Sequence, residues 1–316
     1  AVLLPAAAFC VMGERYAPAR KMIEMGAADV LFISFHQDGR TLYPGSGFCD
    51  ELGGPNAFGM NINIPLQPNT TDDGIHYVLD NLVLPILEDF KPDLVVNSAG
   101  QDNHYTDPLA NMRFTAHGYA SLNEKLDPDL AVLEGGYAIE TALPYVNTGI
   151  ILAMAGLDYS WVREPDYRPE NFRETKEHME YIQSLVSYLW EVWKNRAELG
   201  EEKYPRDGDF LELSRHIYYD TDSIREQQYE EIRLCDNCPG YQVIRSRGMY
   251  PYGSSKLIEA IGLHPRACKS CQEDARKLYE EKKKDYPGVD VIYLQDKPRD
   301  RYFQYSKDGD VELTDE

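Results

Sequence analysis

The chain has 316 residues, of which 43% are hydrophobic and 27% charged, a composition typical of a globular protein with one large or two medium domains. The formal net charge of −21 argues against a partner with a phosphate backbone, although a local basic patch would still allow nucleic acid to bind. Because no hydrophobic run approaches the roughly 18 residues of a membrane helix and no basic segment precedes residues 1–12, we expect a cytoplasmic protein without a signal peptide.

Strands and helices are predicted to alternate through residues 29–160. The predicted strands are the apolar runs Val30–Phe35, Asn61–Leu66, Leu94–Asn97 and Leu130–Leu133. The predicted helices, which have helical spacing of apolar residues, are Ala19–Met25, Asp72–Phe90, Thr115–Asn123 and Glu140–Leu157. Pro85 should kink the second helix because proline has no N–H to donate. This alternation predicts an α/β fold with a parallel sheet and helices on both faces.

The chain becomes more polar after Tyr159. Glu170–Asn195 carries an amphipathic stripe of tyrosine, leucine, valine and tryptophan, which predicts a long helix within a helical extension over residues 161–230. Residues 231–296 contain most of the cysteines and are expected to form a small separate module. Residues 297–316 are polar and acidic, so we expect a weakly ordered tail.

Two Cys-x-x-Cys pairs mark the module: Cys235, Cys238, Cys268 and Cys271. Four thiolates are the ligand set of a structural zinc ion, and a two-residue spacer lets both sulfurs of a pair face one ion. Tyr241–Arg245 and Gly248–Gly253 are predicted hairpin segments and Gln272–Lys284 a predicted helix, so the module resembles a zinc ribbon or treble clef. The alternative is four free or redox-active thiols.

The role of this module beyond holding a small domain together stays open between protein docking, nucleic-acid contact and dimerisation. His264 is close enough in sequence to replace a cysteine ligand, but a surface position is expected for it. Cys10 and Cys49 have no partner in either pair and are assigned no role.

Two loops that follow predicted strands carry residues suited to catalysis. Residues 98–109 follow the third strand and include three candidates: Asp102, His104 and Asp107. Residues 133–137 follow the fourth strand and end in Gly135, Gly136 and Tyr137. Because catalytic groups of open α/β sheets collect at the carboxyl ends of parallel strands, we expect both loops to line one cleft.

Residues 98–109 together with residues 133–137 resemble the zinc-dependent histone deacetylase family, in its bacterial and archaeal branch. Residues 34–36 followed by residues 43–47 resemble an upstream loop of the same family. The match runs from about Val30 to about Leu157 and covers the second half of the family's catalytic domain. It implies an arginase/deacetylase-like fold and a zinc-dependent amidohydrolase that removes an acyl group from acetyl-lysine or an acetylpolyamine-like amine.

The resemblance implies two central roles. Asp107 takes the place of a ligand to the catalytic zinc, and Tyr137 that of the tyrosine whose hydroxyl stabilises the oxyanion. Asp102 and His104 are further catalytic candidates, with structural roles in the loop as an equal alternative. Together they form an Asp-x-His sequence, but in the same loop as Asp107, so we do not expect them to replace the family's zinc ligands.

Further residues match the walls of the family's site. Tyr43 corresponds to the wall of the substrate tunnel, where Gly135 and Gly136 let the backbone run beside the acyl chain. Ser34 and Phe35 match the position at which relatives hold a structural monovalent cation such as K+.

Two motifs of the family are absent from this sequence: the paired histidines and the Asp-x-His zinc ligands. In addition, we expect residues 1–28 to match nothing in the family. The first hypothesis is therefore a zinc-dependent deacetylase, with the activity of this chain in question. The alternative is a catalytically incomplete deacetylase-like subunit that acts as a binding or scaffold protein. Expected partners are an acylated amine or acetyl-lysine protein, a protein bound through the zinc module, and a second copy of the chain.

Overall fold

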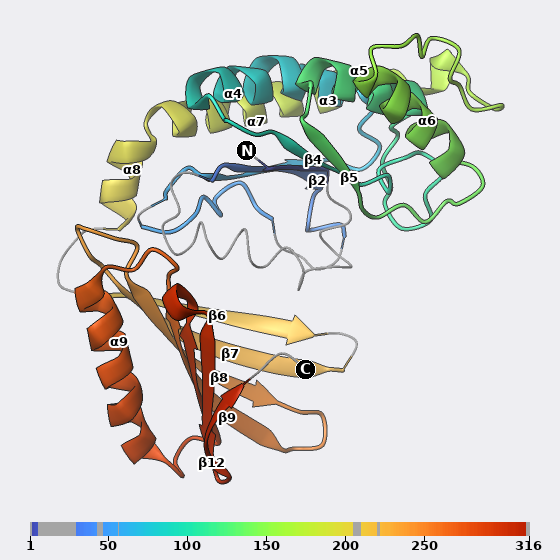
Figure 1. Ribbon diagram of the computed structural model, residues 1–316. Coiled ribbons are helices and arrows are strands. Elements are labelled where there is room, and N and C mark those ends of the chain that lie inside the picture. The colour runs from blue at the N-terminus through green and yellow to red at the C-terminus, as the bar shows by residue number, and fades with distance from the viewer. Residues whose placement is uncertain are drawn as a thin grey trace. The chain divides into compact units, whose positions relative to one another are not determined.

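The computed structural model describes residues 2–5, 30–42, 47–55, 57–204, 210–219 and 222–313 (Figure 1). The chain forms two compact units, the first ending at Gly200 and the second beginning at Glu201. Each unit has its own sheet and its own hydrophobic core. The helix predicted over Ala19–Met25 and the site residue Tyr43 lie outside the described residues.

The first unit contains a parallel sheet, as the alternation of strands and helices predicts. Its described strands are β1 (Val2–Pro5), β2 (Phe32–Gln37), β3 (Asn61–Leu66), β4 (Val96–Ala99) and β5 (Leu130–Leu133). Their order is β3-β2-β1-β4-β5. β1 therefore lies at the centre, between β2 and β4 (Figure 1). The carboxyl ends of all these strands meet at one edge of the sheet.

The predicted helix over Asp72–Phe90 is present in three consecutive parts. These are α3 (Asp72–Val78), a π-helical turn (Leu79–Val83) and α4 (Leu84–Phe90). Pro85 lies just after the π-helical turn and cannot donate a hydrogen bond to it, so the distortion predicted at this proline takes the form of a wider helical turn.

Four more helices follow: α5 (Ala116–Leu126), α6 (Leu143–Met154), α7 (Lys176–Lys194) and α8 (Arg196–Lys203), which crosses the boundary between the units at Gly200. The predicted helix over Glu170–Asn195 begins later, at Lys176, because the Thr175 hydroxyl accepts the N–H of His178 at 3.2 Å and caps α7. Within the described part of the chain, α3, α4 and α7 lie over one face of the sheet (Figure 1), so the expected cover of the second face stays a prediction.

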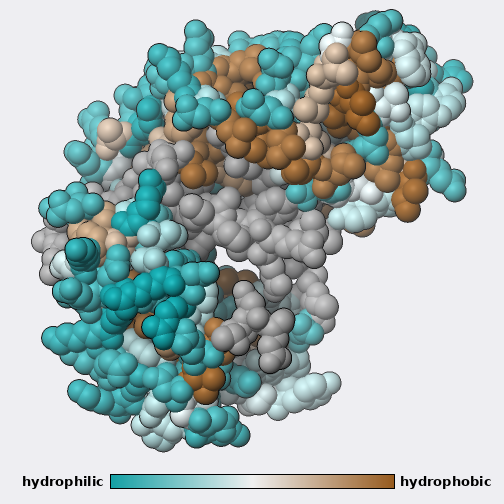
Figure 2. Space-filling model, viewed as in Figure 1, coloured by the Kyte–Doolittle hydropathy of each residue, from teal (hydrophilic) through white to brown (hydrophobic). Residues whose placement is uncertain are grey.

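β5 ends the described sheet on one side, and its leucines are not buried. Leu130 is 50% exposed and Leu133 is 63% exposed. Figure 2 shows hydrophobic surface in the region where Figure 1 places β5, α5 and α6. An apolar strand of a parallel sheet is normally covered on both faces. This strand is therefore more exposed than its sequence pattern indicates.

The second unit contains a mostly antiparallel sheet in the order β12-β11-β10-β9-β8-β7-β6. Its described strands are β6 (Phe210–Tyr219), β7 (Ile224–Arg233), β8 (Tyr241–Met249), β9 (Ser255–Leu263), β10 (Val291–Asp296), β11 (Arg301–Ser306) and β12 (Gly309–Leu313). β9 and β10 are parallel and are connected through α9 (Lys269–Lys282). Ala275 and Tyr279 of α9 share a core with Ile261 and Ile292 of the sheet.

Three predictions for this part of the chain are wrong. The expected helical extension over residues 161–230 contains β6 and part of β7, and the expected small module over residues 231–296 is part of the seven-stranded sheet. The expected tail over residues 297–316 contains β11 and β12, which pair as a hairpin. β7 has polar side chains on both faces, so the alternation that identifies a strand in sequence is weak there.

A groove of about 490 Å³ lies in the second unit, beside α9. Charged side chains of both signs line it, among them Glu259, which is 1% exposed. Arg245 and Lys282 contact one carboxylate oxygen of Glu259 at 2.8 and 3.4 Å.

Among the described helices, none combines the length and the apolar content required to cross a membrane.

Candidate active site

The loops after β4 and β5 are neighbours because β4 and β5 are adjacent parallel strands. The backbone N–H of Gln101 donates to the carbonyl of Gly135 at 2.6 Å, which joins the two loops directly. The two loops therefore meet at one edge of the sheet, and the expectation that they line one cleft stays a prediction.

Asp107 lies between the two loops. Its Oδ1 accepts the backbone N–H of Leu109 at 2.9 Å, an arrangement typical of an aspartate that starts a turn. Its Oδ2 accepts the backbone N–H of Tyr137 at 2.8 Å. The structure thus brings together the residue predicted to bind metal and the residue predicted to stabilise an oxyanion.

Gly136 allows the close approach of the second loop. Its φ angle of +153° is one that side chains rarely adopt, and a Cβ atom there would lie 3.0 Å from both Gln101 Cβ and Leu143 Cδ2. Tyr137 follows directly and is half-buried. Glycine at position 136 is therefore required by backbone packing, independently of any substrate.

His104 is fully buried and both of its ring nitrogens are used. Nδ1 accepts the backbone N–H of Thr106 at 3.2 Å, so Nε2 carries the proton and donates to Glu164 Oε1 at 2.7 Å. Oε1 of Glu164 also accepts the backbone N–H of Ala116 at 2.7 Å. Burial alone would raise the pKa of Glu164, but these hydrogen bonds outweigh it and lower the pKa. This geometry favours a structural role for His104.

Asp102 is also fully buried and precedes Asp107 in the same loop. Burial raises the pKa of the neighbouring Tyr119, and the charges of Asp102 and Asp107 raise it further. Glu164 and Tyr119 surround the loop but were not singled out from the sequence. Neither belongs to a short motif, and both approach the loop through tertiary packing, which no local pattern reports.

Ser34 and Phe35 belong to β2 and are buried. The ring of His36 donates from Nε2 to the carbonyl of Gly47 at 2.8 Å, so its Nδ1 accepts the Ser34 hydroxyl at 3.0 Å. Phe35 packs near Phe114, with ring centroids 6.4 Å apart. Ser34 therefore helps to orient His36, which contacts Gly47 after β2. The assignment of Ser34 and Phe35 to a monovalent cation stays a prediction.

The described residues do not fit the family's catalytic zinc site. An open zinc site needs about three protein ligands. Asp107 belongs to no group of three or more potential ligands in the part of the chain that the structure describes. Both of its carboxylate oxygens already accept backbone N–H groups. The central strand β1 ends at Pro5 and is followed in sequence by Ala6, Ala7 and Ala8, none of which can bind a metal through its side chain.

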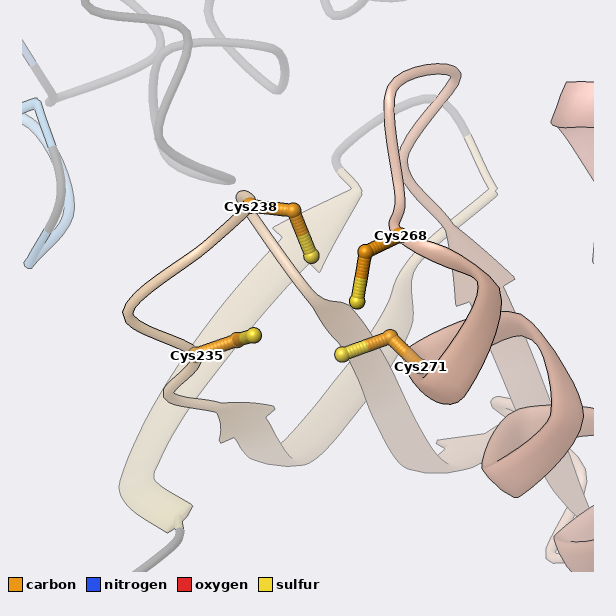
Figure 3. Close-up of side chains that lie close together, drawn as sticks. All are labelled: Cys235, Cys238, Cys268 and Cys271. Carbon is orange, nitrogen blue, oxygen red and sulfur yellow. The ribbon is translucent and has the colours of Figure 1, made fainter.

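The four paired cysteines come together in the second unit, as predicted. Their sulfur atoms all lie within 4.8 Å of one another and converge on one point (Figure 3). A hydrogen bond from the Cys271 backbone lowers the pKa of the Cys268 thiol to about 7. His264 does not join them: it is buried, contrary to expectation, and its Nδ1 accepts the Arg266 N–H at 3.0 Å.

Comparison with known proteins shows what the first unit is similar to. Residues 21–153 match the family described as "Histone deacetylase domain", so the expectation that residues 1–28 match nothing in the family is wrong for residues 21–28. A "Probable deacetylase" of Archaeoglobus fulgidus is 43% identical over 183 residues, which cover 52% of this chain and 50% of that protein. "Histone deacetylase 14, chloroplastic" of Arabidopsis thaliana is 37% identical over 122 residues, or 36% of this chain and 28% of that protein. The "Histone deacetylase-like amidohydrolase" of Pseudomonas aeruginosa is 33% identical over 146 residues, or 43% and 38%.

This chain thus spans about half the length, or less, of these curated relatives. The matched region includes both loops of the candidate site, with Asp107 and Tyr137. Through its first unit, the chain is similar to the histone deacetylase family.

Proposed function

We propose that this chain contributes part of the active site of a deacetylase, an enzyme that hydrolyses an acylated amine. The hydrogen bond from the Tyr137 backbone to the Asp107 carboxylate carries the proposal, because it holds two residues of the family's site motifs side by side. The names of the relatives, deacetylases and an amidohydrolase, support the same class of reaction. The net charge of −21 suits a basic amine such as lysine or a polyamine.

Each residue of the two loops has a proposed part. The phenol of Tyr137 would donate a hydrogen bond to the oxyanion that forms when water adds to the acyl carbonyl. Gly135 and Gly136 would let the backbone run close beside the acyl chain. Asp102 and His104 would act as positioning residues that hold the loop of Asp107, which the His104–Glu164 hydrogen bond supports.

Two assignments from the family resemblance remain proposals. Tyr43 would form part of the wall around the acyl chain, and Ser34 with Phe35 would hold a monovalent cation. No reaction step is assigned to a catalytic zinc ion, because Asp107 supplies one carboxylate where about three ligands are needed. Activity therefore requires ligands other than the residues described above.

A second candidate function is a catalytically incomplete, deacetylase-like subunit that binds or scaffolds a partner. Two observations favour it. Asp107 uses both carboxylate oxygens within the protein, and His104 is committed to Glu164. Such a chain would keep the family fold and loop packing without hydrolysing the acyl bond.

The discriminating experiment compares this chain of 316 residues with a longer polypeptide, the complete product, in which the first half of the family's catalytic domain precedes it. The substrates are an acetyl-lysine peptide and an acetylated polyamine, with added zinc. We expect chelator-sensitive turnover from the complete product and very little from the chain alone. Inactivity of the complete product with zinc would favour the second candidate function. Chelator-sensitive turnover by the chain alone would instead mean that other residues, such as Asp102 and His104, complete the site.

The matched variants of the complete product are Tyr137→Phe and Tyr188→Phe. Loss of the Tyr137 hydroxyl should lower turnover by about 10²–10³-fold, because one donor to the oxyanion is removed, while metal content stays unchanged. Tyr188 lies on α7 and is 46% exposed, so removing its hydroxyl should leave turnover unchanged. Equal activity of both variants would remove Tyr137 from the proposed mechanism.

A further inference from the structure

The four paired cysteines come from two separate segments of the second unit. Cys235 and Cys238 lie in the connection between β7 and β8, and Cys268 and Cys271 lie at the start of α9 (Figure 3). All four side chains point toward one centre. Residues 239–267, which include all of β8 and β9, separate the two pairs in sequence, so tertiary folding has brought them together.

The spacing of the sulfur atoms fits one metal ion. The sulfurs lie within 4.8 Å of one another. Four thiolates around a tetrahedral zinc at about 2.3 Å lie about 3.8 Å apart, so small rotations of the side chains would complete the coordination. An iron–sulfur cluster places several irons and sulfides between its cysteines and would require a wider arrangement.

The backbone around Cys238 provides an independent observation. The N–H of Gly240 donates to Cys238 Sγ at 3.3 Å, a contact that stabilises a negatively charged sulfur. Gly240 has a φ of +71°, and a Cβ atom there would lie 2.2 Å from the carbonyl oxygen of Arg233. Only glycine fits this turn, so the local sequence is built to direct an N–H group at a ligand sulfur.

We propose that Cys235, Cys238, Cys268 and Cys271 bind one structural zinc ion, which fixes the start of α9 to the β7–β8 connection. Cys271 is 2% exposed and belongs to the core that α9 forms with the sheet. With four protein ligands the ion has no open position for water or substrate, so this site is separate from the deacetylase chemistry. Because the ligands meet only in the folded unit, zinc binding adds to its stability.

The test measures metal content and stability of the full chain purified under reducing conditions. We expect about one zinc per chain, and a cobalt-substituted form with the absorption of tetrahedral thiolate coordination. Cys235→Ser and Cys271→Ser should each lower zinc content to near zero and increase hydrogen exchange in α9. Cys49→Ser is the matched control, since Cys49 is a free cysteine of the first unit, and should leave both unchanged.

Two further measurements keep the result interpretable if the serine variants unfold. Cys268→His keeps a zinc ligand and should retain zinc with lower affinity. A strong chelator should lower the thermal stability of the unmodified chain, and added zinc should restore it. Zinc content that survives both serine substitutions, or stoichiometric iron in place of zinc, would overturn the proposal.

Discussion

The carboxylate of Asp107 accepts the backbone N–H of Tyr137 at 2.8 Å, across the two loops that follow neighbouring parallel strands. A second oxygen of the same carboxylate accepts the N–H of Leu109 at 2.9 Å. One side chain therefore fixes both the shape of its own loop and the position of the next. The Asp107–Tyr137 arrangement is a structural requirement before any metal or substrate is considered.

Asp107→Asn should consequently destabilise the protein. Asparagine has one acceptor oxygen in place of two, so one of the two N–H groups would face the amide NH2 group. We expect the free energy of unfolding to fall by about 1–3 kcal/mol in urea titrations. Asp93→Asn replaces an exposed carboxylate and serves as the control, with an expected change below about 0.5 kcal/mol. Equal stability of the two variants would contradict this account of Asp107.

His104→Ala should be more disruptive, because it leaves the buried carboxylate of Glu164 without its imidazole partner. Removing the donor of a buried hydrogen bond to a charged group costs about 1.5–3 kcal/mol, measurable by chemical denaturation. Adding Glu164→Gln should recover part of this loss, so that the two effects are not additive. His178→Ala breaks a more exposed pair with Glu174 and should cost about 1 kcal/mol or less. A similar loss for both histidines would argue against the buried pair.

The stability of the first unit should depend on pH through Asp72. Desolvation raises the pKa of Asp72 to about 7, although hydrogen bonds from Thr115 oppose the shift. Because the folded state holds this proton more tightly than the unfolded state, the contribution of Asp72 to stability is greatest below about pH 4 and is lost as the pH rises through 7. Asp72→Asn cannot lose a proton, so its stability should fall less than that of the unmodified chain between pH 4 and 8. Asp93→Asn, at an exposed position, should keep the original slope.

Gly136→Ala tests the close approach of the two loops. The added Cβ would lie 3.0 Å from atoms of Gln101 and Leu143, in a backbone conformation that already disfavours a side chain. We expect a loss of about 1–3 kcal/mol in thermal or urea unfolding. Gly156→Ala is a matched control, since Gly156 also has a positive φ but an added Cβ there would meet no atom within 4 Å. The loss at Gly136 should be the larger one.

The sequence was most informative where a short segment contains the whole signal. The loop of Asp107, the Gly135-Gly136-Tyr137 turn and the two cysteine pairs are all local patterns, and the structure brings their members together. The partners that complete them could not be predicted in this way. Glu164 reaches His104 from 60 residues away, and no residue near Glu164 indicates that contact.

The second unit shows a different reason for error. β7 places Gln227 and Gln228 opposite Arg247 and Ser246 of β8, so polar residues occupy both faces in this part of the strand. Stability there comes from cross-strand pairs, for example Arg215 with Glu230, and these become visible only when the register is known. The hydrophobic pattern alone therefore did not lead to the prediction of β6, of β7 or of the final hairpin formed by β11 and β12.

The exposed edge of the first sheet affects how the protein behaves in solution. β5 presents Leu130 and Leu133 beside backbone groups that, on its outer side, pair with no strand among the described residues. Such an edge is a template for strands of other molecules, and proteins usually protect it with charge, proline or a covering element. At high protein concentration β5 would thus favour self-association. The apparent mass from light scattering and the sedimentation coefficient should therefore rise with protein concentration. The rise should be smaller for Leu133→Glu, which places a charge on the edge strand.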